Sequence, residues 1–371
     1  MDILEEKLKY NVRVFVALSG FLTLIGLVFI YSSSSIYALE KFGSAHYFLK
    51  KQFFYLIPAF IGFAFFARIS VAYLKKITPY LFLFSIGLMV LTILPKLSIS
   101  IHGSRRWLSI FGFNFQPSEF LKLFLFMYIG FFLERKQKMI RSFLHSYLPF
   151  LLVLGCTFVL LLLQPDFGSV VTIFATAIMI FFVAEFKMIY LGVTLLCAFP
   201  FGLYLIVAKP YRLNRILVFL NPWADPQGSG FQIIQSLIAI GSGQLWGLGI
   251  SGSKQKFFYL PMQHTDFIFP IIAEETGFIG SVLIVVSFFL FCLYGMRIAL
   301  SLKTPYAFFT SLGFVMFMSL QAIMNLMVTT GLLPTKGLGL PFVSYGGTAL
   351  VSFFCMVGLI VNFARLELAE Y

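Results

Sequence analysis

Long apolar runs recur along the whole 371-residue chain, and each is about as long as a lipid bilayer is thick. A helix needs about 20 residues to cross the hydrocarbon core. We count ten such runs, near 13–31, 47–66, 78–94, 117–133, 147–163, 168–184, 188–208, 267–293, 306–329 and 343–363. The runs are continuous and do not alternate with polar residues, which excludes a membrane β-barrel. We therefore expect an all-α polytopic membrane protein with ten transmembrane helices.

The polar residues between the runs show no soluble domain. Hydrophobic residues make up 60% of the chain and charged residues 11%, whereas soluble domains carry about 25% charged residues. The first run lacks a small-residue cleavage pattern, so we interpret it as a retained helix and not a signal peptide. We expect one transmembrane domain over residues 1–371, with a large external loop at about 209–266 between the seventh and eighth helices.

The net charge of +13 has two explanations. The loops on the N-terminal side of the membrane carry twice as many Lys and Arg as the short loops opposite, which places both termini in the cytoplasm. The 209–266 loop is then external, yet it also holds five basic residues that topology does not explain. An anionic partner would explain them. Nucleic acid is excluded, because the basic residues are scattered between spans and form no soluble basic domain.

Residues 260–277 place ionisable groups where this loop meets an apolar helix. His264 and Asp266 stand at the junction, and Glu274 and Glu275 lie two turns further in. Such groups are costly near a membrane unless they have partners or a task. Asp266 would either cap the helix or, with its pKa raised by desolvation, act as a general base. His264 has no second ligand at a spacing suited to a metal.

The loop before the fourth helix carries a second set of candidates. Arg105 and Arg106 can bind phosphate through paired hydrogen bonds. Trp107, which follows them, is either an interfacial belt residue or a residue that faces substrate. Glu119 and Lys122 share a helix face. They are either a structural ion pair or a pair that lines a cavity.

Three further segments complete the candidate site. Asp166, in a tight turn, either caps a helix or faces the same external cavity. Lys336, between two Pro- and Gly-broken segments, would neutralise a phosphate or extend to the membrane surface, and Ser344 follows it. The glycine-rich stretch 241–252 allows close backbone approach. No strand is expected before it, so it is not a nucleotide-binding loop.

These motifs together resemble the SEDS family (shape, elongation, division and sporulation), the FtsW/RodA group. The matching segments run in family order and are 103–107, 116–122, 164–168, 212–235, 264–277 and 331–347. Residues 221–223 and 331–337 are more similar to the division member, FtsW, than to the elongation member, RodA.

The resemblance implies a ten-helix peptidoglycan glycosyltransferase of the bacterial inner membrane, acting in cell division or elongation. Such an enzyme polymerises lipid II, an undecaprenyl-diphosphate-linked disaccharide-peptide, on the outer face of the membrane. Its partners would be a class B penicillin-binding protein as transpeptidase and other division or elongation membrane proteins. The family's catalytic aspartate corresponds to Asp266, its tryptophan to Trp107, and its Glu/Lys pair to Glu119 and Lys122. Glu275 becomes a supporting residue.

The mechanistic hypothesis is inverting glycosyl transfer with Asp266 as general base. The residues expected to bind substrate or stabilise the departing diphosphate are Trp107, Arg105, Arg106, Arg212, Arg215, His264, Lys336 and Ser344. The sequence identifies no certain cofactor, and a bound divalent cation, Mg²⁺ or Mn²⁺, could share this charge. The alternatives are a lipid II flippase or transporter and a non-catalytic division scaffold. The external placement of the ionisable groups and the lack of an inverted repeat favour the enzyme.

Overall fold

The structure is a computed structural model, and it describes residues 2–94, 98–101, 104–110, 113–257 and 260–369. Long helices account for most of these residues. The elements in chain order are α1 (Asp2–Phe42), α2 (Tyr47–Phe66), α3 (Val71–Ile93), β1 (Ser98–Ile101), β2 (Ser104–Ile110), β3 (Phe113–Phe115), α4 (Pro117–Lys136), η1 (Gln137–Met139), η2 (Phe143–Tyr147), α5 (Leu148–Leu163), α6 (Phe167–Val183), α7 (Met188–Val207), α8 (Pro210–Leu220), η3 (Pro222–Ala224), α9 (Phe231–Ser242), α10 (Ile268–Leu300), α11 (Pro305–Thr329) and α12 (Gly347–Ala369).

Each of the ten predicted spans is a helix, and the expected fold class, an all-α polytopic membrane protein, is confirmed. Within the described ranges, eight helices are long and apolar enough to cross a membrane. The other two predicted spans are α4, whose 20 residues include the Glu119–Lys122 pair, and α6, which has 17 residues. Several predicted ends were too short, because helices such as α1 and α10 continue beyond their apolar stretches into charged turns.

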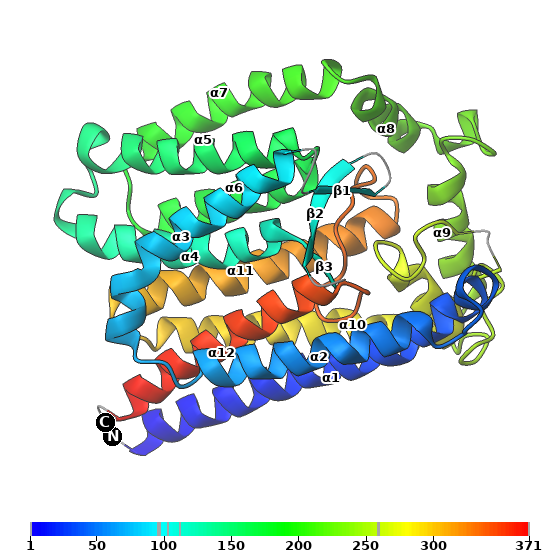
Figure 1. Cartoon of the computed structure of the whole chain (residues 1–371), viewed down its shortest axis with the longest axis horizontal. Coiled ribbons are helices and arrows are strands. Elements are labelled where there is room, and N and C mark those ends of the chain that lie inside the picture. Colours follow the sequence, from blue (N-terminus) through cyan, green and yellow to red (C-terminus); the bar gives the residue numbers. More distant parts are fainter. Residues whose placement is uncertain (1, 95–97, 102–103, 111–112, 258–259, 370–371) are drawn as a thin grey trace.

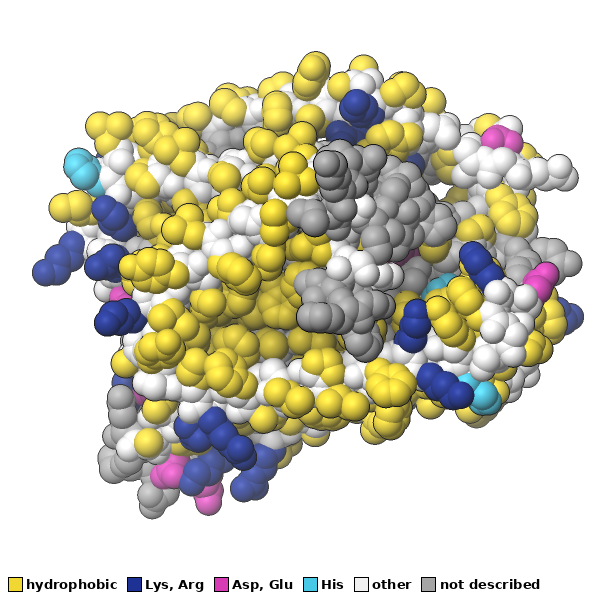
Figure 2. Space-filling model, in the orientation of Figure 1, with side chains coloured by type: hydrophobic (Ala, Val, Ile, Leu, Met, Phe, Trp, Pro, Cys, Tyr) yellow, Lys and Arg dark blue, Asp and Glu magenta, His cyan; other side chains and the backbone are white. Residues whose placement is uncertain are grey.

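The long helices run roughly side by side and define two ends of the molecule (Figure 1). Both termini lie at one end, which we call the terminal end. The sheet, α8 and α9 lie at the other, which we call the loop end. Apolar side chains cover much of the flank over the long helices, as a bilayer requires, and basic side chains gather at the terminal end (Figure 2).

Pairs of helices distant in sequence pack along each other. α2 lies along α12, α1 along α10, and α4 along α11, while α4 also contacts α3, the helix before it in the chain. Polar side chains add bonds between these helices: the Asn362 amide donates to the carbonyls of Phe66 and Ile69 at 2.8 and 2.7 Å. At the terminal end, Lys303 pairs with Glu367 at 2.9 Å. By contrast, Leu191 is the one buried residue of α7 among those described.

Two segments expected to be irregular contain regular structure. Between α3 and α4, β1, β2 and β3 form an antiparallel sheet in the order β1-β2-β3. β1 (SISI) and β3 (FNF) do alternate apolar and polar residues, but four and three residues are too few for this pattern to predict a strand. The 209–266 segment holds α8, η3 and α9. α9 lies against α10 and crosswise to the long helices (Figure 1).

Candidate active site at the loop end

A cavity of about 1280 Å³ opens among the loops at the loop end. Its walls come from β2, the start of α4, the 164–168 turn, α8 and two loops, 260–267 and 334–347. The predicted site residues that line it are Arg106, Trp107, Glu119, Lys122, Asp166, Arg212, Arg215, His264, Asp266, Lys336 and Ser344. Segments spread over most of the chain therefore meet in one chamber, as the sequence predicted.

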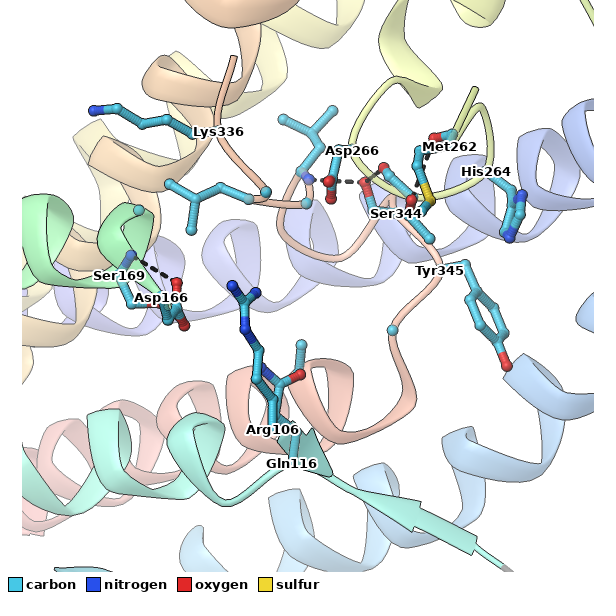
Figure 3. Close-up of a pocket in the computed structure, with 18 of the residues that line it drawn as sticks. Arg106, Gln116, Asp166, Ser169, Met262, His264, Asp266, Lys336, Ser344 and Tyr345 are labelled. Carbon is cyan, nitrogen blue, oxygen red and sulfur yellow. Dashed lines mark hydrogen bonds between the residues drawn. The ribbon is translucent and has the colours of Figure 1, made fainter. Parts of the chain in front are cut away.

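Asp266 lies on the last turn before α10, with its side chain in the cavity (Figure 3). Within the described part of the chain, its carboxylate accepts no hydrogen bond and forms no ion pair. Burial raises the pKa of Asp266 to about 6, while the positive charges of Arg106 and Arg215 oppose this shift. The carboxylate is thus largely ionised at neutral pH, but it takes up a proton more readily than an exposed aspartate.

The backbone around Asp266 is held firmly, although its carboxylate is not. The Asn325 side-chain amide donates to the carbonyls of Asp266 and Leu338 at 2.8 and 2.6 Å. The Ser344 hydroxyl donates to the Thr265 carbonyl at 2.6 Å, and the Tyr345 N–H donates to the His264 carbonyl at 2.9 Å. These bonds join the 260–267 and 334–347 loops, so the position of Asp266 is set by both. Ser344 acts here on the backbone of the neighbouring loop.

Arg106 approaches the cavity from β2, and Figure 3 shows its guanidinium beside Asp166, in the chamber that also holds Asp266. Its Nε donates to the Gln164 carbonyl at 2.7 Å, and Nη2 donates to the Pro165 carbonyl at 2.6 Å. Asp166 caps α6 by accepting from the N–H and hydroxyl of Ser169 at 3.2 and 2.8 Å. The two interpretations of Asp166 are therefore compatible, because it caps a helix and also lines the cavity.

Three more cations surround the chamber. Arg212 Nη1 donates to the Leu205 carbonyl at 2.8 Å, and its guanidinium lies over the Phe167 ring at 5.2 Å. Arg215 Nη1 donates to the Thr335 carbonyl at 3.1 Å, and burial lowers its pKa. Burial also lowers the pKa of Lys336 to about 8, and its ammonium points away from Asp266 (Figure 3). Both arginines are fixed by backbone carbonyls and keep further N–H groups for a ligand.

His264 serves a different purpose from its neighbour Asp266. Its ring packs among Tyr37, Phe48 and Tyr345, with centroids 5.9, 4.3 and 5.8 Å away. Burial lowers the pKa of His264 to about 4, so the ring is neutral at physiological pH. A neutral ring in this setting packs against the aromatic wall and supplies no charge for an anionic ligand.

The predicted Glu119–Lys122 pair forms: Lys122 Nζ lies 2.6 Å from Glu119 Oε1, and both side chains are buried. The pair lines the inner wall of the cavity, so a structural ion pair and a cavity-lining pair are here the same feature. Trp107 also lines the cavity and is half-buried on β2. The backbone of Arg105 belongs to β2, but its side chain lies outside the described part of the structure.

Glu275, expected to support the cavity, does not line it. It lies with Glu274 in a separate buried cluster against residues 251–256. Ser32 donates to both Glu275 oxygens at 2.6 and 2.7 Å, and Lys256 Nζ lies 3.4 Å from Oε1. Glu274 accepts from the Lys254 N–H at 2.9 Å and from the Ser253 hydroxyl. The side chains of Glu274 and Glu275 leave α10 toward residues 251–256, so these carboxylates do not reach the chamber.

No group of three or more His, Cys, Asp or Glu residues among the described ones is arranged to hold a metal ion. Asp166 and Asp266 both line the chamber, and Asp166 already accepts a hydrogen bond from Ser169. A divalent cation, Mg²⁺ or Mn²⁺, would have to bind these two carboxylates, one of which is already bonded to Ser169. Its presence stays a prediction.

Two residues that position the site were not assigned a role from the sequence. Asn325 bonds the Asp266 loop, and Gln321 Nε2 donates to the Gly339 carbonyl at 2.9 Å. They are four residues apart on α11 and both are buried. The sequence did contain a signal for these two residues, because they are side-chain amides four residues apart in an apolar span. Such groups need hydrogen-bond partners in a membrane.

The fold and the chamber define a multi-pass membrane protein with a charged cavity at one end of its helix bundle. The family model described as a cell cycle protein, for the FtsW, RodA and SpoVE group, matches residues 12–368. The chain therefore belongs to this family, as the SEDS resemblance predicted.

Individual relatives agree over nearly the full length. A probable peptidoglycan glycosyltransferase FtsW of Geobacter sp. (strain M18) is 41% identical over 341 residues, covering 92% of this chain and 93% of the relative. Stage V sporulation protein E of Bacillus subtilis (strain 168) is 39% identical over 344 residues, covering 92% and 93%.

Solved structures share the fold. A chain from a peptidoglycan synthase complex, described as coordinating polymerization and crosslinking, has a TM-score of 0.78 at 28% identity, covering 95% of this chain and 97% of that one. The rod shape determining protein RodA of Thermus thermophilus has a TM-score of 0.69 at 25% identity, covering 95% of each chain.

Proposed function

We propose that the protein is a peptidoglycan glycosyltransferase that joins lipid II disaccharide units into glycan strands, with Asp266 as the general base. The observation that carries this proposal is an unpaired carboxylate that faces fixed cations in a chamber large enough for a lipid-linked sugar. The names of the relatives support the reaction class.

Asp266 is suited to accept a proton in the transition state. Its pKa of about 6 keeps it ionised at neutral pH and close to the range in which a general base works best. The acceptor sugar hydroxyl gives its proton to Asp266, and its oxygen attacks the anomeric carbon of the donor. The bond from that carbon to the diphosphate breaks, and the diphosphate leaves with the electron pair.

Arg106, Arg212 and Arg215 stabilise the departing diphosphate, with Lys336 as a further positive charge. Backbone carbonyls already hold the three guanidinium groups in place, so little reorganisation is needed when the negative charge develops. Trp107 packs on sugar or lipid at the chamber wall. Arg105, which precedes Arg106 on the same strand, completes the predicted set of cations.

Orientation and partners follow from the same proposal. The terminal end faces the cytoplasm of a bacterium, and the chamber opens on the outer face of the inner membrane, where lipid II is consumed. A class B penicillin-binding protein crosslinks the glycan product, together with other division or elongation proteins. The related chain in a peptidoglycan synthase complex supports a polymerase that works in such an assembly.

The test is polymerisation of purified lipid II by the purified protein, with and without the partner transpeptidase. We expect glycan strands from the wild type and none from Asp266→Ala, which should still fold. Near wild-type polymerisation by Asp266→Ala would refute the role of Asp266. A flippase would move lipid II across vesicles without making polymer, and a scaffold would do neither, so the three functions give different results.

A further inference from the structure

A glycine-rich loop after α9, residues 243–252, lies against a break in α10. We call it the tip loop. α10 leaves helical geometry at Gly277, whose φ is +67°. The Phe278 N–H donates to the Gln244 carbonyl at 2.8 Å, and the Leu248 and Gly249 N–H groups donate to the carbonyls of α10 residues 274 and 275, each at 3.0 Å. The tip loop thus replaces backbone bonds that the break removes from α10.

This contact requires glycine on both sides. A Cβ atom on Gly247 would lie 2.2 Å from the Glu275 carbonyl oxygen, and one on Gly277 would lie 2.4 Å from the Gly247 nitrogen. The two backbones therefore touch directly. Because loop and helix satisfy each other's N–H and C=O groups, this irregular backbone can lie at a depth where water is scarce.

The charges on α10 indicate that depth. Between Glu275 and Arg297 the helix is uncharged, and this stretch spans about 30 Å, the thickness of the hydrocarbon core. Ser32, which bonds Glu275, is separated from Arg13 on α1 by about 28 Å of helix. The charges of α10 therefore place the membrane boundary of the loop end beside Gly277, next to the tip loop, and the uncharged stretch of α1 from Arg13 to Glu40 is long enough to reach this level.

The tip loop presents apolar side chains outward at this level. Trp246 is 80% exposed and Ile250 is 69% exposed, and Leu245 and Leu248 are also exposed. No residue from 243 to 252 is charged. The apolar surface continues onto α10, where Phe278 and Ile279 are exposed on the flank of a membrane-spanning helix. A tryptophan and aliphatic residues at such a boundary are typical of membrane-interface anchors.

We propose that the tip loop is a lipid-binding anchor whose apolar side chains enter the loop-end leaflet of the bilayer and contact phospholipid acyl chains. The occupant is lipid, because the patch is continuous with the bilayer-facing surface of α10. The anchor fixes the depth of the α10 break and, through α10, the height of the chamber relative to the membrane. In this proposal, residues 243–252 of the predicted external loop 209–266 enter the membrane instead of lying outside it.

The fluorescence of Trp246 tests the proposal. A Trp107→Phe/Trp223→Phe protein keeps Trp246 as its single tryptophan, and it is placed in nanodiscs of phosphatidylcholine brominated near the headgroup end or near the terminus of the acyl chains. We expect bromine near the headgroup end to quench about half of the emission, with weaker quenching by terminal bromine and by aqueous acrylamide.

Strong acrylamide quenching without bromolipid quenching would place Trp246 in water and overturn the proposal. Insensitivity to both quenchers would show that protein, such as a second copy, covers the patch, and it would overturn the proposal equally. If the double variant does not fold, the difference in emission between the wild type and Trp246→Phe in the same nanodiscs isolates the signal of Trp246. The same quenching patterns of that signal then support or overturn the proposal.

Discussion

Asp266 and the pair Glu274 and Glu275 lie a few residues apart on one segment, yet the structure treats them in opposite ways. Glu275 accepts bonds from Ser32 and faces Lys256, and it is buried. Among the described residues, the Asp266 carboxylate has no such bond, and it faces cations whose own donors are held by backbone carbonyls. The charge of one group is neutralised within the protein, while that of the other is left available for a ligand.

This difference indicates that Glu275 contributes to the stability of the fold, whereas Asp266 is available for the reaction. A carboxylate with all its partners in place holds segments together and has nothing left to offer a substrate. A carboxylate without partners raises the free energy of the folded protein, and a protein retains it where it has a task. Position near the membrane therefore does not distinguish the two kinds of acid, but the bonds of each oxygen do.

The substitution Asp266→Asn should have the largest effect, and that effect is on the polymerisation rate. Loss of a general base should lower lipid II polymerisation by about 10²–10⁴-fold. Stability at neutral pH should not fall. The pKa of Asp266 is about 6 in the folded protein, above the ordinary value of 3.8. The ionised side chain therefore destabilises the folded state, increasingly as the pH rises from 3.8 to about 6, and its removal should not lower stability. Glycan product and thermal unfolding are measured on the same preparation. A parallel loss of folding would mean that Asp266 is structural, like Glu275.

Glu275→Gln should have the opposite profile. It leaves the ammonium of Lys256, which is 4% exposed, without its ionic partner, and loss of one member of a buried ion pair destabilises by about 3 kcal/mol or more. Thermal unfolding in detergent or nanodiscs measures this loss. The matched control is Glu275→Gln with Lys256→Met, which should recover most of the stability. A stable but inactive Glu275→Gln protein would contradict the contrast with Asp266.

A smaller effect is expected where α10 breaks beside the glutamates. Gly277→Ala places a side chain at a φ of +67° and against the Leu245 carbonyl, and it should destabilise the protein by about 1–3 kcal/mol. Gly241→Ala, at the end of α9 just before the tip loop, has nothing within 4 Å of the added Cβ. Its expected effect is a gain of up to about 1 kcal/mol. Equal melting temperatures for the two variants would rule out the close contact.

The smallest effect is a shift in pH dependence. Polymerisation by the wild type should fall as the pH drops through about 6, because Asp266 becomes protonated. Arg106 lowers the pKa of Asp266, so Arg106→Gln should move this acidic limb to higher pH by about one unit. The plateau rate is expected to fall as well, but the position of the limb is the diagnostic measurement. An unmoved limb would show that another group controls it.

Much of this arrangement could be predicted from the sequence. Apolar runs indicated the ten helices, and spacing alone indicated the Glu119–Lys122 pair. Loops that were rich in polar residues on one side of the membrane indicated the segments that meet in the chamber. These predictions succeeded because they depend on local periodicity and on the cost of charge in a bilayer.

The individual partners could not be predicted in this way. Glu275 and Asp266 are similar acids near the same boundary, and the contacts that Glu275 makes with Ser32 and Lys256, both distant in sequence, distinguish them. The neutral state of His264 depends on aromatic rings from α1, α2 and the 334–347 loop. Such contacts are set by tertiary packing, which the sequence does not reveal residue by residue.

The bond between Ser32 and Glu275 also implies an order of assembly. Ser32, Ser253 and Lys256 all precede Glu275 in the chain, so its partners have been synthesised when α10 emerges from the ribosome. The residues that complete the surroundings of Asp266, namely Asn325, Ser344 and Tyr345, come later. During synthesis the buried ionic cluster can therefore close first, and the reactive chamber is finished only as the last two helices are added.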